Sequence, residues 1–498
     1  MKRSFSVVVV LGFIPFGIAA GIAQQSATSG PRHPDPLPES SPVWTKHGST
    51  PRSGDICIVH VTIIDTASGK EDRDRVVTIS GDRIAGIAAG SAMAPTGSCT
   101  VIDGTGKYLI PGLWDMHAHG SQFDGVLPLY VANGVTGIRE MAGPLDANQF
   151  RRELAARHVV APHIYLGSPL IDGDPPMWPN ISIAVKNATQ GRSAVDTQKK
   201  NGADFIKVYS GLNREGYDAI LDESKRQGIP VEGHVPDVVT AWEASREGQR
   251  SFEHLQAVPL ACSSREAELR TKVFAAQNDQ QADPLYLEAL RTRDDEKCRS
   301  LFALLKKNGS WQTPTLTVHH YFAWPADHHA SDDARLRYFS GGPRDLLTLE
   351  GDPRLKGWTA KEYSVARELF AAYESFVGFM FANGVPMLAG SDSMNPYIFP
   401  GFSIHDELAY FVESGVTPLG ALQAATLNPA LFMNAKEKYG SVAPGKLADL
   451  VLLDADPLAD IHNTSKIYEV FLAGEEFDRA RLDRLISTAR DAPSQKSY

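Results

Sequence analysis

Short apolar segments that alternate with amphipathic segments dominate the middle of this chain. The clearest unit is a predicted strand at 204–209, a helix that begins after Asn213 and stops at Gly228, and a second strand at 229–234. Asn213 is a typical helix N-cap and Gly228 a typical helix stop. A strand, a helix and a strand of these lengths imply parallel strands joined by a crossover. The pattern therefore predicts α/β structure.

The same alternation continues towards the C-terminus. We expect a helix over about 238–247, strands at 251–254 and 385–392, and helices over about 404–414 and 419–425. Such units extend over about 320 residues, and polar residues stand at the strand ends. This predicts a (β/α)8 barrel of the TIM type rather than a doubly wound open sheet.

Two long insertions interrupt the predicted barrel. Residues 261–309 are charged and helical, whereas residues 321–361 are irregular. Loops of this length inside a compact domain are often functional. We therefore expect lids or pocket walls here.

The two flanks of the barrel region have a β pattern. Residues 56–101 contain short strands with turns at Gly69 and Gly81, which predicts a small antiparallel unit, and 448–453 is a clear strand. We expect these flanks to pair, so that the barrel is inserted in a small β-sandwich. The predicted divisions are a signal peptide at 1–23, a disordered linker at 24–53, the first sandwich part at 54–112, the barrel at 113–432, the second sandwich part at 433–480 and a tail at 481–498.

The N-terminus and the overall charge limit location and partners. Lys2 and Arg3 precede an apolar run that ends in small residues near Ala23, which is the plan of a cleaved signal peptide; an uncleaved membrane anchor is the alternative. We expect an exported protein, periplasmic or secreted, without stable membrane insertion after cleavage. The formal net charge of −10 argues against a nucleic-acid partner. Small molecules are the expected ligands, and a homo-oligomer stays open.

Four cysteines occur in the chain, and none has the CxxC spacing of a zinc or redox site. In an exported protein two disulfides are expected, between Cys57 and Cys99 and between Cys262 and Cys298, because each pair lies within one local unit. Four buried free thiols are the alternative.

The sequence YLIPGLWDMHAHG places His117 and His119 two positions apart at the end of an apolar run. Residues i and i+2 of a strand share a face, so the two imidazoles can converge on one metal ion. Two separately hydrogen-bonded histidines are the alternative for this motif alone.

Further chemical groups stand at the ends of later predicted strands. Lys207 lies inside DFIKVY, where a buried ammonium is costly unless it is used or reaches a carboxylate at the strand end. His234, His254 and Asp392 each follow a short apolar segment. Singly these are ordinary structural residues, but the active-site rim of a TIM barrel is where its strands end.

These six residues resemble the metal-ligand set of the amidohydrolase superfamily, in its variant with two metal ions and a carboxylated lysine. The segments LIPGLWDMHAH and GSVAPGKLADLVLLDADPL are also similar to signatures of that family. The resemblance spans residues 54–475. It implies that His117, His119 and Asp392 hold one divalent ion, that His234 and His254 hold the other, and that a carbamate on Lys207 bridges them. Zinc suits these ligands best.

The resemblance also implies a reaction. A bridging hydroxide would attack a scissile carbonyl, and Asp392 would carry the proton to the leaving nitrogen. Tyr209 could donate to the oxyanion, or only pack at the rim. Arg139 could bind a substrate carboxylate, or form a structural ion pair with Glu140 or another acidic neighbour.

The GVTGIRE, EHL and GFSIHDELAYFVESGVTPLGALQAAT segments are most similar to the imidazolonepropionase-related branch with its Xaa-Pro and Xaa-Arg dipeptidases. The expected reaction is hydrolysis of the amide bond of a small N-acyl amino acid or dipeptide. A lactonase, an arylesterase or a cyclic-amide hydrolase with the same centre is the alternative enzyme. A non-enzymatic binding protein on this fold is the alternative class, although such relatives usually lack ligands.

Overall fold

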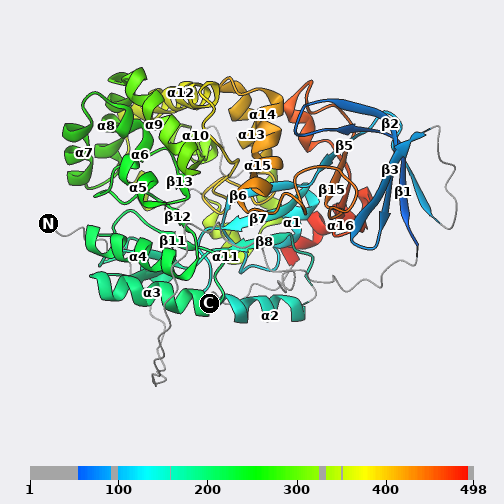
Figure 1. The fold of residues 1–498 in the computed structure, drawn as a ribbon, viewed down its shortest axis with the longest axis horizontal. Coiled ribbons are helices and arrows are strands. Elements are labelled where there is room, and N and C mark those ends of the chain that lie inside the picture. The colour runs from blue at the N-terminus through cyan, green and yellow to red at the C-terminus, as the bar shows by residue number, and fades with distance from the viewer. Residues whose placement is uncertain (1–53, 91–98, 158, 325–332, 349–351, 492–498) are drawn as a thin grey trace.

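The computed structural model describes residues 54–90, 99–157, 159–324, 333–348 and 352–491 of the 498-residue chain. A β-rich part occupies one end of the molecule and a larger part of strands and helices the other (Figure 1). The predicted signal peptide at 1–23 and the linker up to Ser53 lie outside the described residues. Among the described helices, none combines the length and the apolar character needed to cross a bilayer.

The β-rich part is one eight-stranded sheet in the order β17-β16-β15-β5-β1-β2-β3, with β4 paired to β1. Leu450 of β15 lies opposite Pro111 of β5, so the predicted pairing of the two flanks is confirmed. The strands are β1 Ile56–Ile64, β2 Glu71–Ser80, β3 Arg83–Ala89, β4 Thr100–Asp103, β5 Tyr108–Pro111, β15 Leu450–Leu453, β16 Ile467–Leu472 and β17 Glu475–Phe477.

The prediction that the N-terminal unit is antiparallel is only partly right. β1, β2 and β3 are antiparallel neighbours, but β4 and β5 run parallel to β1 on its other side. The chain leaves the β2–β3 hairpin and re-enters the sheet along the free edge of β1. The sheet also has an apolar core of its own, which includes Ile58, Val77, Leu452 and Phe471 and fits a small sandwich.

Short parallel strands form the centre of the larger part. A three-stranded sheet has the order β6-β7-β8, with bounds Leu113–Ala118, Val135–Glu140 and His163–Leu166. A six-stranded sheet has the order β10-β9-β11-β12-β13-β14. Its strands are β9 Leu170–Asp172, β10 Ser182–Ala184, β11 Ile206–Val208, β12 Val231–Gly233, β13 Ser251–Glu253 and β14 Trp311–Thr313.

Isolated backbone bridges connect these two sheets to each other and to segment 385–392. Gly167, just after β8, forms a parallel bridge with Phe205, just before β11. At the other edge Met387 bridges Gln312 of β14. The ladders are not continuous, so the assigned sheets do not form a closed ring.

Residues 385–392 do not form the regular strand that the sequence predicted. They still run beside β6, because the Met116 N–H donates to the Ala389 carbonyl at 2.8 Å. Asp392 then adopts a left-handed backbone conformation, with φ 57°, which ends any regular ladder.

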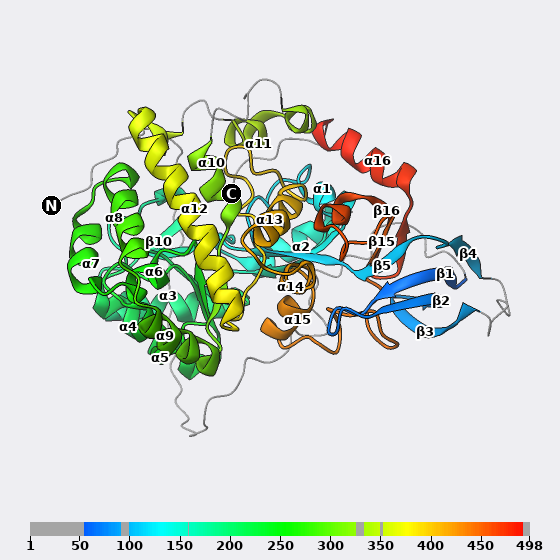
Figure 2. The same cartoon turned by 90° about the horizontal axis from the view of Figure 1, so that it is seen from above.

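Helices pack around these strands, as two views show (Figures 1 and 2). Helix α4 matches its prediction: the Asn213 side chain accepts from the Gly216 N–H at 2.8 Å, and Gly228 closes the helix in a left-handed conformation. The helices of this part are α1 Leu127–Ala132, α2 Ala147–Arg157, α3 Ala188–Lys200, α4 Arg214–Gln227, α5 Ala241–Glu247, α13 Ser403–Glu413, α14 Pro418–Ala424 and α15 Leu427–Phe432. Helix α16 Arg479–Thr488 follows β17 and packs against β16 and α1.

The two insertions have the predicted character. The first contains α6 Ala257–Cys262, α7 Glu266–Ala275, α8 Asp279–Arg291 and α9 Asp295–Asn308. The second lies between α10 Leu316–Ala323 and α12 Ala360–Ala382. Within it, the described residues 333–348 and 352–359 contain short helices only: η3 Ala334–Tyr338, α11 Gly341–Leu346 and η4 Pro353–Leu355.

Both predicted disulfides are present. Cys57 is bonded to Cys99 with Cα atoms 6.1 Å apart, and Cys262 to Cys298 with Cα atoms 4.7 Å apart. The first ties β1 to the segment before β4, and the second ties α6 to α9. The alternative of four free thiols is excluded in this structure.

Candidate metal centre

The six predicted ligands stand at or just beyond the carboxyl ends of parallel strands, on neighbouring elements of the larger part. His117 and His119 belong to the end of β6, Lys207 lies within β11, His234 follows β12, His254 follows β13, and Asp392 follows the extended segment beside β6. Such a rim is the usual place for an active site in folds built from parallel strands.

Three of these groups are close enough to share one metal ion. Asp392 Oδ1 lies 3.1 Å from His119 Nε2 and 3.5 Å from His117 Nε2. One ligand atom from each of the three lies within 4.8 Å of the others. Two imidazoles and a carboxylate are ligands that divalent zinc prefers.

The other two histidines continue this group. The His254 ring lies 4.6 Å from the His117 ring and 4.6 Å from the His234 ring, measured between centroids. His254 Nδ1 is also 3.9 Å from Asp392 Oδ2. The four imidazoles therefore form one continuous cluster around Asp392.

Each imidazole is oriented by a contact to its Nδ1 atom, which leaves Nε2 as the nitrogen available to a metal ion. Such outer contacts fix the tautomer and the direction of a ligating ring. The partners are Glu253 Oε2 for His117 at 2.9 Å, Glu140 Oε1 for His119 at 3.4 Å, Ser210 Oγ for His234 at 2.9 Å and Thr315 Oγ1 for His254 at 2.8 Å.

The pKa values fit neutral ligands at most of these positions. Burial lowers the pKa of His117 to about 4, and burial also lowers the pKa values of His234 and His254 well below the usual value. At His119 burial acts in the same direction, but hydrogen bonds to Asp392 and Glu140 raise the pKa to about 9. A metal ion would therefore have to displace a proton only at His119.

Lys207 is deeply buried, with 1% of its surface exposed. Burial lowers the pKa of its amine to about 8. The side chain passes over Gly233, where an added Cβ would lie 2.8 Å from Lys207 Cδ and 2.4 Å from the Val208 carbonyl oxygen. Gly233 has φ +124°, so this passage depends on glycine.

Backbone strain is concentrated among the ligands and their supports. His254, Asp392 and Thr315 all have left-handed backbones, with φ 63°, 57° and 51°. Each such residue costs on the order of 1–3 kcal/mol, and persists only where its surroundings hold it. Clustered strain of this kind is common at functional sites.

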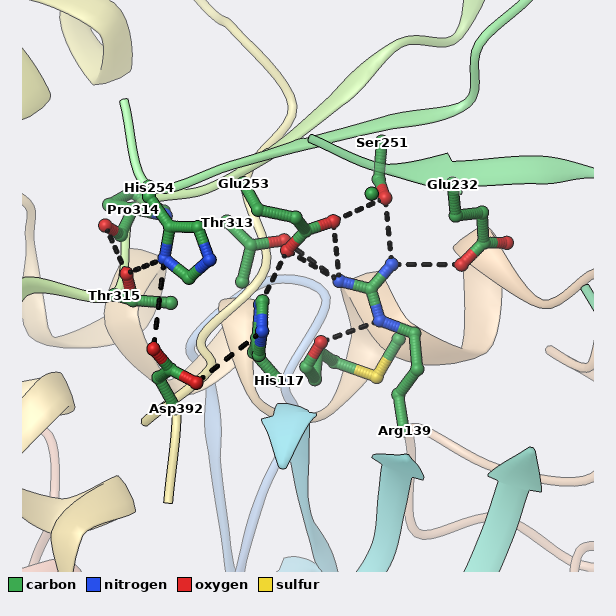
Figure 3. A network of polar contacts seen from close by, with 12 residues as sticks. His117, Arg139, Glu232, Ser251, Glu253, His254, Thr313, Pro314, Thr315 and Asp392 are labelled. Carbon is green, nitrogen blue, oxygen red and sulfur yellow. Dashed lines mark hydrogen bonds and ion pairs between the residues drawn. The ribbon is translucent and has the colours of Figure 1, made fainter. Parts of the chain in front are cut away.

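Arg139 does not face the site. It is completely buried, and its five N–H groups donate inside the protein (Figure 3), so none is left for a substrate. The prediction that Arg139 binds a substrate carboxylate is wrong; the alternative of a structural ion pair is right, with Glu232 and Glu253 as partners rather than Glu140. The acceptors are Met116 O at 2.6 Å, Glu232 Oε2 at 2.9 Å, Ser251 Oγ at 2.8 Å, both Glu253 oxygens at 3.0 Å and Thr313 Oγ1 at 3.0 Å.

Tyr209 lies beside the cluster, with its ring 4.0 Å from that of His234. Trp178 Nε1 donates to the Tyr209 hydroxyl at 3.1 Å. Since the hydroxyl oxygen is the acceptor in this contact, its own proton remains available for donation. The structure therefore leaves the predicted role of Tyr209 open.

The sequence interpretation missed the groups that support the ligands. Glu253 and Glu232 carry charge inside short apolar strands, which is the same signal that identified Lys207. Asp115, two residues before His117, also faces inwards and accepts from the Ser391 hydroxyl at 2.5 Å. Burial raises the pKa of Asp115 to about 6. Serine and threonine partners such as Ser210 and Thr315 have no comparable signal.

Comparison with known proteins gives a partial match in sequence. Residues 378–477 match the model of the amidohydrolase family. The imidazolonepropionase of Thermoplasma volcanium is 33% identical over 110 residues, which cover 21% of this chain and 26% of that protein. The chain spans between 8% and 26% of the length of the curated relatives it matches.

Solved structures match over most of the chain. A Xaa-Pro dipeptidase with bound methionine in its active site is 19% identical with a TM-score of 0.62, covering 85% of this chain and all of that one. The bottromycin amidohydrolase is 24% identical with a TM-score of 0.67, covering 91% of this chain and 95% of that one. At these identities the likeness concerns the fold. Together with the family match, it confirms the predicted resemblance to amidohydrolases.

Proposed function

We propose, starting from this resemblance to amidohydrolases, that the protein is a metal-dependent hydrolase that cleaves a C–N bond of a small molecule. The observation that carries the proposal is the cluster of four imidazoles around Asp392, each held through Nδ1 by a residue that is not a predicted ligand, so that Nε2 is the nitrogen left for a metal ion. A histidine cluster that served only stability would not need four rings oriented in one way.

The residues present fit two divalent ions. His117, His119 and Asp392 would hold one ion, and His234 and His254 the other, with zinc the best match to these ligands. Lys207 would have to carry a carbamate, because an ammonium has no lone pair for a metal. When bound, such ions would supply Lewis acidity and a water molecule of lowered pKa.

The chain's own residues supply the remaining chemistry. Asp392 is hydrogen-bonded to His119, and although burial acts to raise its pKa, His117 and the other imidazoles hold it well below the usual value. Asp392 is therefore ionised, and as a carboxylate it would accept a proton from water and pass it to the leaving nitrogen. Tyr209 would donate its free hydroxyl proton to the carbonyl oxygen as negative charge develops there.

The substrate we favour is a small N-acyl amino acid or a dipeptide. The fold neighbours include a Xaa-Pro dipeptidase, which supports a peptide-like amide. The sequence match to an imidazolonepropionase keeps a cyclic amide as the second candidate. Fold similarity transfers substrate poorly, so a direct screen decides between them.

We also infer that the two parallel sheets form one (β/α)8 barrel. The bridge of Gly167 to Phe205 supports this because it connects the end of β8 to the start of β11. Segment 385–392 supports it too, because Met387 bridges Gln312 of β14 and the Ala389 carbonyl accepts from the Met116 N–H of β6. Export with cleavage near Ala23 remains a proposal from the sequence. Mass spectrometry of the mature N-terminus would test it.

One experiment tests the function. The purified protein is assayed with N-acyl amino acids, dipeptides, cyclic amides and lactones, and metal content is measured on the same sample. We expect about two divalent ions per chain, amide hydrolysis that stops on metal removal and returns with zinc, and a mass increase of one carbamate at Lys207. Full activity in the metal-free protein would refute the proposal.

A further inference from the structure

Two arginines of the second insertion repeat one local arrangement. Asp333 precedes Arg335 by two residues, and Asp352 precedes Arg354 by two residues. In each pair the carboxylate accepts from the backbone N–H of the arginine, at 2.8 Å and 2.9 Å, and from its Nε and Nη2 atoms. The acid thus holds the guanidinium along one edge and fixes its plane.

Each of the two guanidinium groups also lies against an aromatic ring. The Arg335 guanidinium lies 4.3 Å from the centroid of the Phe399 ring, and that of Arg354 lies 4.9 Å from the centroid of the Phe322 ring. An arginine stacked on a ring and held by a carboxylate keeps little rotational freedom. Both guanidinium groups are therefore preorganised.

The two arginines differ at the remaining nitrogen. Nη1 of Arg335 donates to Asp406 Oδ2 at 3.1 Å. Nη1 of Arg354 reaches no acceptor among the residues that the structure describes. A carboxylate of the protein therefore occupies Nη1 of Arg335, whereas Nη1 of Arg354 is open in the part of the chain that the structure describes. A planar guanidinium with a free edge is well suited to bind a further carboxylate.

Arg354 packs against helix α10, which also contacts the candidate metal centre. The ring beneath it, Phe322, belongs to α10, and the neighbouring Tyr321 hydroxyl donates at 3.0 Å to the carboxylate that holds Arg354. On the same helix, His319 Nε2 contacts the carbonyl oxygen of His254 at 3.0 Å. One helix therefore connects Arg354 to the ligand His254.

The charge of Arg354 also acts on two residues of the candidate centre. Burial acts to lower its pKa, but Asp352 and, more weakly, Asp392 raise it above the usual value. Burial raises the pKa of Tyr209, and the charge of Arg354 acts against that rise. Asp392 and Tyr209 belong to different segments, segment 385–392 and the loop after β11, and the charge of Arg354 acts on both.

We propose that Arg354 binds the carboxylate of the substrate through Nη1, and that the substrate is an N-acyl amino acid or dipeptide with a free carboxyl terminus. The inference rests on the proposed function and narrows it: neutral amides and lactones lack the group that Arg354 recognises. Arg354 thus has the specificity role that the sequence had suggested for Arg139.

The test compares matched substrates and matched variants. The substrates are the N-acyl amino acid hydrolysed best by the wild type and the carboxamide of the same compound. Arg354→Gln should raise KM for the acid about 10- to 100-fold, the scale of a lost hydrogen bond to a charged group, with kcat little changed and the carboxamide within about twofold. Arg335→Gln, in the filled copy of the arrangement, should leave the preference for the acid unchanged.

Binding measurements separate this inference from the proposed function. N-acetyl-leucine and N-acetyl-leucinamide are titrated calorimetrically into the metal-loaded wild type, Arg354→Gln, Arg354→Lys and the control Arg335→Gln, after thermal melts have shown that each variant is folded. A preference for the acid that only the Arg354 variants lose supports the proposal, even if no amide is hydrolysed. A wild type without preference, or a preference that survives Arg354→Gln, overturns it.

Discussion

Replacing Glu253 by glutamine should weaken both the fold and the metal centre. The Glu253 side chain is inaccessible to solvent and contacts both Arg139, at 3.0 Å, and His117 Nδ1, at 2.9 Å. The glutamine side chain keeps the shape of glutamate but loses its charge, and its NH₂ group would face the N–H donors of Arg139 and His117. Breaking a buried ion pair from one side costs about 3–5 kcal/mol. Losing the outer partner of a metal-binding histidine costs roughly 10- to 100-fold in metal affinity.

Glu232→Gln provides the matched control. Glu232 pairs with the same guanidinium at 2.9 Å and accepts from the Tyr165 hydroxyl at 3.1 Å, but it contacts none of the four histidines. We expect both variants to lose stability in denaturant titrations, and only Glu253→Gln to lose zinc affinity in competition with a chelator. If Glu253→Gln binds zinc as the wild type does, Glu253 does not orient His117. Equal losses of affinity in both variants would instead indicate general loosening of the core.

Three further predictions follow from the site and its scaffold. Asp392→Asn should keep most of the metal but lower kcat by roughly 10²-fold or more, and an asparagine variant with near-full activity would show that Asp392 is not the proton carrier. His254→Ala should mainly lower metal occupancy, and its activity should recover in part at high zinc concentration. Gly233→Ala should displace Lys207 and abolish its carbamate, as intact mass would show, because the new Cβ would lie 2.4 Å from the Val208 carbonyl oxygen; an unchanged mass would contradict this. Cys262→Ser with Cys298→Ser should lower the free energy of unfolding by about 2–4 kcal/mol. Because reduction also breaks the Cys57–Cys99 bond, the check is made in a Cys57→Ser, Cys99→Ser background, where reduction should cause the same loss only while Cys262 and Cys298 are present.

Local chemistry made part of this structure predictable. Helix α4 begins and ends at the residues that the sequence indicated, because Asn213 and Gly228 act within one turn of the helix ends. The six ligand candidates could be found for a related reason: a histidine, lysine or aspartate at the end of an apolar strand is costly without a use. The sequence left open whether Arg139 binds substrate or forms a structural ion pair, because its partners Glu232 and Glu253 belong to other strands.

Long-range contacts account for what the sequence did not predict. The contrast between Arg335 and Arg354 depends on Asp406, which lies 71 residues from Arg335. The parallel course of β4 and β5 beside β1 depends on how the chain returns to the sheet, and a strand pattern does not contain that direction. Ser210 and Thr315 became recognisable only once His234 and His254 were placed beside them.

The pairing of β5 with β15 also determines how late in synthesis this sheet can be completed. Leu450 must be synthesised before it can lie opposite Pro111, and roughly 340 residues separate the two positions. At a synthesis rate of about 5–20 residues per second, β5 waits roughly 17–70 s for its neighbour. During that time an apolar strand edge is open to other chains. A chain that ends before Leu450 would keep this edge permanently, so premature termination is expected to give aggregation rather than a smaller soluble enzyme.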